Sequence, residues 1–116
     1  MEVVDFIRRQ LDADERSAMI AAGPIGYNWQ ADGGSVFAEH PTDEIVDYAG
    51  QAAEHIAVHD PARVLRQVAA MRAIVDACEY TLDYEDYGWP LARDVLRHLA
   101  TIYADRDGYQ PEWAPE

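Results

Sequence analysis

The chain has 116 residues, 49% of them hydrophobic, which suits one folded domain with a modest core and excludes a chain that is disordered throughout. Acidic residues outnumber basic ones by 22 to nine, all nine being arginine, and the formal net charge is −13. Direct binding to a nucleic-acid backbone needs a basic surface, so this charge disfavours it. Cys78 is the single cysteine, which excludes an intrachain disulfide and a zinc site made of several cysteines.

The N-terminal sequence becomes charged within a few residues, and no apolar run approaches the roughly 18 residues that span a bilayer. The pattern of a secretory signal peptide is also missing. We therefore expect a cytoplasmic protein that does not contact a membrane.

Residues 3–21 are expected to form the first helix. Apolar side chains recur at helical spacing on one side, at Val4, Ile7, Leu11 and Ala18. The stretch "AAGPIG" at 21–26 ends this helix, because glycine favours a helix end and proline prevents continuation.

Residues 27–41 predict a short β-hairpin that packs on helices. Tyr27, Trp29, Val36 and Phe37 favour strands, and the "DGG" at 32–34 between them is typical of a hairpin turn.

A second helix is predicted over residues 41–59. Thr42 is a suitable N-cap, and Asp43 and Glu44 would lie in the first turn, where the helix dipole favours negative charge. An apolar line follows at helical spacing: Ile45, Ala49, Ala52 and Ile56.

The clearest helix covers residues 60–82. Asp60 is a good N-cap, and Pro61 is favoured at the first helical position. Steps of three and four residues then produce a heptad seam of six apolar side chains: Val64, Val68, Met71, Val75, Cys78 and Leu82. Two interpretations stay open, a core helix of a monomeric bundle and a seam that also pairs subunits of a homo-oligomer.

The last helix is predicted over residues 90–104, where Leu91, Val95, Leu99 and Ile102 share one face. Residues 105–116 are a polar tail that is expected to be loose unless Trp113 docks. The expected fold class is mainly α: a single domain over 1–116, with a bundle of three to four helices and a short β-hairpin inserted after the first helix.

A metal site is one hypothesis for the stretch "HIAVHDPARVLRQV" at 55–68. His55 and His59 are four residues apart and would share a helix face, where such a pair can bind a divalent transition metal with Asp60 as a third ligand. This set would suit a metal-dependent hydrolase. The alternative is structural: Asp60 and Pro61 are fully explained as the N-cap and first residue of the next helix, and we expect no cofactor on that interpretation.

The stretch "CEYTLDYEDYGW" at 78–89 alternates acidic and aromatic residues. Such a run is often a solvated face, but tyrosine is an efficient contact residue and acids select a basic partner. The candidate partner-binding surface consists of Glu79, Tyr80, Asp83, Tyr84, Glu85, Asp86, Tyr87 and Trp89. The hairpin tip at residues 32–34 is a second candidate contact.

No catalytic motif is evident. Ser17 and Ser35 are the only serines and stand in no nucleophile motif, while Cys78 lies on the apolar seam and is expected in the core. We therefore favour a non-catalytic accessory or regulatory protein that binds another protein. A DNA-mimicking inhibitor of a basic protein is the alternative, although six of the nine arginines lie in residues 61–116 and dilute the negative charge there.

Three blocks carry a resemblance: "AGPIGYNW", "EHIAVHDPARVLRQVAAMRAIVD" and "LATIYADRDGYQPEW". Together they resemble a family of small uncharacterised proteins of actinobacteria and actinobacteriophages that has an H-I-A-x-H-D-P-A-R-V-L-R block. The resemblance covers most of the chain. "GPIGYNW" departs from it by spreading what is a compact Gly-Pro-Trp in the family. The resemblance implies a mainly helical fold and no established activity.

Overall fold

The computed structural model describes residues 1–39, 44–84 and 87–114. Its contacts divide the chain into two compact units. We call residues 1–13 with 69–116 the first unit and residues 14–68 the second unit, and each is described by itself.

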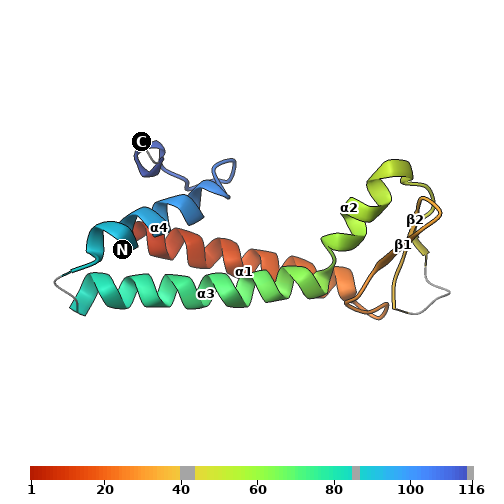
Figure 1. The fold of residues 1–116 in the computed structure, drawn as a ribbon, viewed down its shortest axis with the longest axis horizontal. Helices are drawn as coiled ribbons and strands as arrows, with labels where there is room; N and C mark the ends of the chain where they lie inside the picture. Colours follow the sequence, from red (N-terminus) through yellow and green to blue (C-terminus); the bar gives the residue numbers. More distant parts are fainter. Residues whose placement is uncertain (40–43, 85–86, 115–116) are drawn as a thin grey trace. The chain divides into compact units, whose positions relative to one another are not determined.

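Helices make up most of the described chain (Figure 1). Helix α1 spans Glu2–Ala22, α3 spans Pro61–Tyr84 and α4 spans Trp89–Thr101, so the helices predicted over 3–21, 60–82 and 90–104 are confirmed within a few residues. A small sheet follows the first helix, as expected. Nothing in the described residues forms a helix that is long and apolar enough to cross a membrane. The expected arrangement of the helices as one bundle stays a prediction.

The core of the first unit is built on the start of α1. Val4, Phe6, Ile7 and Leu11 are fully buried there. Trp113 of the short 3-10 helix η2, Pro111–Trp113, places its ring 5.2 Å from that of Phe6, centroid to centroid, and is itself buried. Trp113, the side chain whose docking was expected to decide whether the C-terminal segment is loose, is therefore packed on α1.

Ion pairs join α1 to α3 within the first unit, where the two helices lie side by side (Figure 1). The guanidinium of Arg8 is 2.8 Å from a carboxylate oxygen of Asp76 and 3.0 Å from one of Glu79. Hydrogen bonds to Glu79 and then to Asp76 raise the pKa of Arg8 above its ordinary value. Both partners are partly exposed, so these pairs fix the geometry more than they stabilise the fold.

Helix α4 buries a different face from the predicted row of Leu91, Val95, Leu99 and Ile102. Ala92, Leu96 and Ala100 are buried, whereas Leu91 and Ile102 are 69% and 55% exposed. The small alanines allow a close approach to neighbouring elements. The other two residues of the predicted row, Val95 and Leu99, are half-buried.

The second unit contains a three-stranded antiparallel sheet in the order β1-β2-β3. Strand β1 is Gln30–Asp32 and β2 is Ser35–Phe37, with Asp32 opposite Ser35, so Gly33 and Gly34 alone form the turn. Both glycines have positive φ, 59° and 84°, the conformation that tight hairpin turns require. The predicted hairpin is confirmed.

The helix predicted over residues 41–59 is wrong in its first part. Residues Glu44–Val46 form strand β3, which pairs with β2, and only a 3-10 turn η1, Gly50–Ala52, and helix α2, Ala53–Val58, are helical. Pairing with a formed hairpin outweighs the weak helical preference of this segment. Thr42 and Asp43, the predicted cap and first-turn acid, lie outside the described residues.

The core of the second unit lies between α2 and the sheet, which contact one another (Figure 1). Val36 of β2 is packed with Ala53 and Ala57 of α2, and Trp29 and Ile56 cover this cluster.

Candidate functional site

An apolar groove runs between α3 and α4 in the first unit. Its volume is about 510 Å³. On α3 it is lined at helical spacing by Ile74, Ala77, Cys78 and Thr81, and on α4 by Leu91, Ala92 and Val95. The Thr81 hydroxyl donates to the carbonyl of Ala77 at 3.0 Å, so it is satisfied within its own helix and leaves its methyl for contact. We call this feature the groove.

The two residues directly before α4, Tyr87 and Gly88, also line the groove. Gly88 has φ of 87°, a conformation that side-chain-bearing residues rarely adopt, and it is the N-cap of α4. A Cβ at this position would lie 3.5 Å from the Thr81 methyl carbon. Glycine at this position therefore serves both the start of α4 and the wall of the groove.

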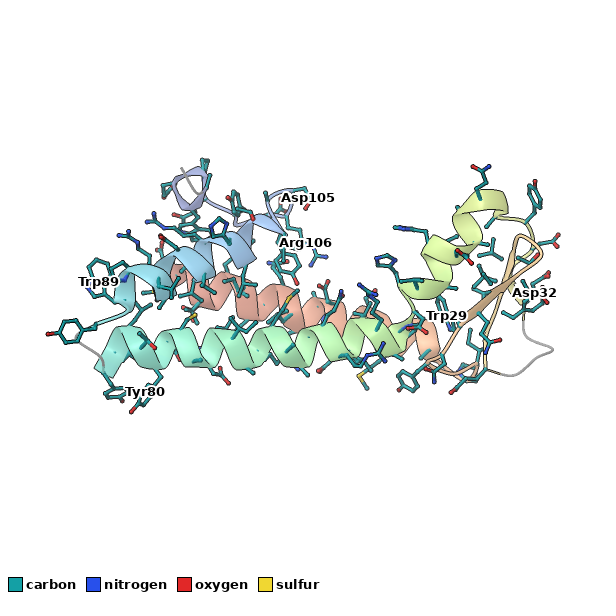
Figure 2. The ribbon with its side chains drawn as sticks, in the orientation of Figure 1. Trp29, Asp32, Tyr80, Trp89, Asp105 and Arg106 are labelled. Atoms are coloured by element: carbon teal, nitrogen blue, oxygen red, sulfur yellow. The ribbon has the colours of Figure 1, made fainter. Side chains whose placement is uncertain are left out.

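Aromatic side chains of the predicted partner-binding surface lie in the last part of α3 and around the start of α4. Tyr80, Tyr84, Tyr87 and Trp89 are all exposed, from 45% at Trp89 to 89% at Tyr87. The rings of Tyr80 and Tyr84 lie 5.0 Å apart, and the guanidinium of Arg93 lies 5.2 Å from the Trp89 ring. Figure 2 labels Tyr80 and Trp89. These contacts reduce the freedom of the rings, which lowers the entropy cost of binding a partner.

The acidic members of the same predicted set differ from one another. Glu79 is half-buried and accepts two hydrogen bonds from Arg8, so it serves the packing of the first unit. Asp83 is exposed on α3. Glu85 and Asp86 lie outside the described residues. The groove itself was missed by the sequence analysis, because Leu91 and Val95 were assigned to one apolar face of a helix without any sign of what would cover it.

Cys78 forms part of the groove floor. It is 8% exposed, and burial raises the pKa of its thiol. A thiol that stays protonated is a weak nucleophile, so the side chain contributes packing in its present environment.

The seam predicted along α3 faces inward. Val68, Val75 and Cys78 are buried, and Val64, Met71 and Leu82 are half-buried. The chain itself thus covers much of the seam, and pairing of subunits through it stays a prediction.

The second unit contains the corner at residues 55–63. The Asp60 carboxylate accepts the backbone N–H of Arg63 at 2.9 Å and that of Trp29 at 3.0 Å. The first bond is the predicted N-cap of α3, and the second ties the residue before β1 to that helix. Both carboxylate oxygens are engaged with backbone donors.

The two histidines of this corner lie together. Their ring centroids are 4.4 Å apart, and Nδ1 of His59 is 2.8 Å from the carbonyl oxygen of His55. Within the described part of the chain, no group of three or more histidine, cysteine, aspartate or glutamate side chains is placed to hold a metal ion. The metal set of His55, His59 and Asp60 stays a prediction.

Comparison with known proteins yields one family. Neither the curated proteins nor the solved structures contain a match to this chain. The family model described as a family of unknown function, DUF6221, matches residues 1–115. This match covers nearly the whole chain, including both units, and the chain therefore belongs to the DUF6221 family, whose function is unknown.

Proposed function

We propose that this is a non-catalytic accessory or regulatory protein that binds an amphipathic helix of a basic protein partner in the groove. The observation that supports this most is an apolar groove with exposed Leu91 and Ile74 on its walls. Helix-binding grooves take side chains at positions i, i+3 or i+4 and i+7 of the bound helix. The walls of this groove are themselves two helices with that spacing, so a third helix can interlock with them.

Charge favours a basic partner over a second copy of the chain. The first unit has thirteen acidic residues against six arginines, a net charge of −7. Asp76 and Asp83 are exposed on α3, and Asp94 is exposed on α4. Like charges would oppose the approach of a second copy, whereas a basic helix would be attracted.

The aromatic side chains provide a second kind of contact. Tyr84, Tyr87 and Trp89 each offer a large apolar face with few rotatable bonds, the type of residue that dominates binding energy at interfaces. Tyr87 belongs both to the groove and to this exposed set. A bound helix could thus rest on the groove and end against the aromatic rings.

Three synthetic peptides test this function. The first is a basic amphipathic helix with leucines at i, i+3, i+4 and i+7 and lysines elsewhere, the second replaces the lysines by glutamate, and the third replaces the leucines by serine. Amide shifts in NMR spectra of the isotope-labelled chain report where each binds. We expect the first peptide to shift groove residues and to slow alkylation of Cys78 by iodoacetamide, because it covers the thiol.

Two exposed aliphatic residues of α4 and its C-terminal end give matched variants. Leu91→Gln removes an apolar contact inside the groove and should weaken binding of the first peptide about ten-fold. Ile102→Gln makes a comparable change outside the groove and should leave affinity unchanged. If the serine peptide binds as tightly as the first peptide and loses its binding at high salt, the groove is not the binding site. That result would favour recognition by charge alone, as in a DNA mimic. If the glutamate peptide binds as tightly as the first peptide, the proposal that the partner is basic is wrong.

A further inference from the structure

Two histidines lie together at the end of α2. His55 is the third residue of this helix and His59 is the residue that caps its end, so the two are four positions apart, about one turn of helix. The backbone N–H of His59 donates to the carbonyl of His55 at 3.2 Å, which closes that turn. Both side chains are exposed, and their ring centroids are 4.4 Å apart. The pair belongs to the second unit and shares no residue with the groove.

The backbone fixes the orientation of one of the two rings. Nδ1 of His59 lies 2.8 Å from the carbonyl oxygen of His55. A carbonyl oxygen can only accept a hydrogen bond, so in the neutral ring Nδ1 carries the proton and Nε2 keeps its lone pair. Histidines that bind metal ions hold their other ring nitrogen in this way, because the bond fixes both the tautomer and the direction of the ring. Nε2 of His59 is thus prepared as a metal ligand.

The distance between the rings decides which coordination geometry fits. A metal ion bound about 2.0 Å from a ring nitrogen lies about 3.2 Å from the centroid of that ring. When each ring directs a nitrogen at the same ion, centroids 4.4 Å apart subtend an angle of about 90° at that ion. Neighbouring ligands of a square-planar or octahedral ion make this angle, whereas tetrahedral coordination would need centroids about 5.2 Å apart. The pair therefore fits Cu²⁺ or Ni²⁺ better than Zn²⁺.

The type of ligand points to the same ions. Imidazole suits copper, nickel and zinc, and a nitrogen site binds Cu²⁺ most tightly among the divalent ions of the first transition row. Asp60 is not counted as a ligand, because its two carboxylate oxygens accept the backbone N–H groups of Arg63 and Trp29. Over residues 1–39, 44–84 and 87–114, no third histidine, cysteine, aspartate or glutamate completes a larger set. Water would therefore fill the other positions of a bound ion.

We propose that His55 and His59 form a surface site for a divalent transition metal ion, with Cu²⁺ bound most tightly, through one nitrogen of each ring. The bound ion links the two residues across the last turn of α2. A helix of six residues has little stability by itself, and this bridge would hold its last turn closed. The site keeps the two histidines of the predicted metal set, leaves out Asp60 and involves no reaction.

Titration of the full chain with Cu²⁺ tests this site, at about pH 7.5 so that most imidazole groups are neutral. Isothermal titration calorimetry measures the stoichiometry and the affinity, and electron paramagnetic resonance reports how many nitrogens bind the ion. We expect one tightly bound ion per chain with two nitrogen ligands, and weaker binding of Ni²⁺ and Zn²⁺. In NMR spectra of the isotope-labelled chain, substoichiometric Cu²⁺ should broaden the signals of residues 55–59 first.

Three single variants separate this pair from other copper ligands. His55→Ala and His59→Ala each leave one donor of the two, and we expect Cu²⁺ to bind about 100-fold more weakly, because the second contact is no longer intramolecular. Both side chains are exposed, so these variants should fold, which circular dichroism checks. His98→Ala removes an exposed histidine of α4 and is the matched control, in which the affinity should not change.

Several results would overturn the proposal. Unchanged Cu²⁺ affinity in His55→Ala or in His59→Ala would show that the two rings do not act together. Broadening that begins outside residues 55–59 would place the ion elsewhere, and tighter binding of Zn²⁺ than of Cu²⁺ would contradict the coordination geometry. None of these outcomes depends on whether the groove binds a helix.

Discussion

At the scale of single residues, Asp60 shows how one side chain can carry two structural tasks. Its carboxylate caps α3 through the N–H of Arg63 and holds the N–H of Trp29. The first task was predictable, because aspartate before proline at a helix start is a local pattern. The second was not, since it joins residues 31 positions apart in the sequence.

Replacing Asp60 by alanine should therefore cost more than the loss of an ordinary cap. Both backbone donors lose their acceptor, and we expect the free energy of unfolding to fall by about 2–3 kcal/mol. Asp60→Asn keeps one acceptor oxygen and should lose about 1 kcal/mol. Urea unfolding measures both. Glu54→Ala, at an exposed site, is the control, and a loss in Asp60→Ala no larger than in this control would contradict the double role.

Cys78 gives a second residue-scale prediction, on pH. Burial raises the pKa of its thiol in the folded chain, so the unfolded chain releases its proton first as the pH rises above about 8.5. The folded state should therefore lose stability at alkaline pH, and Cys78→Ala should lack this part of the loss. Urea unfolding of both proteins at pH 7 and pH 10 measures the difference. An identical pH dependence in the two proteins would contradict it.

At the scale of elements, the sequence predicted best where the backbone's requirements are local. Two glycines with positive φ set the hairpin turn, and Asp60 with Pro61 starts α3. The prediction of a helix at residues 44–46 failed because a strand there depends on its pairing with β2, and the segment's own sequence does not contain that information. The prediction of the buried face of α4 failed because that face has one large apolar residue, Leu96, between two alanines, which give a weaker hydrophobic signal than the row of larger side chains at Leu91, Val95, Leu99 and Ile102.

The short helix η2 gives the element-scale prediction. Trp113 is buried against Phe6, and Trp113→Ala should lower the free energy of unfolding by about 3–5 kcal/mol, because a large cavity would remain. Trp89→Ala removes an equally large side chain that is 45% exposed, and the loss should stay below about 1 kcal/mol. Urea unfolding compares the two variants, and equal losses would show that η2 does not stabilise the first unit.

At the scale of the whole molecule, charge governs association. The net charge is −13, and the seam of α3 is buried or half-buried by the chain itself. We expect a monomer mass by light scattering at micromolar concentration and physiological salt. A dimer mass that reverts to monomer in Leu91→Gln would show instead that a second copy occupies the groove.

The sequence by itself determined the helical class, the hairpin, the start of α3 and the acidity, because these depend on neighbouring residues or on composition alone. The tertiary structure decided which faces are covered. It left Leu91 and Ile74 at the surface beside a groove, and it brought the backbone of Trp29 to the Asp60 carboxylate. Burial is a property of what packs against a side chain, and periodicity in one segment does not contain that information.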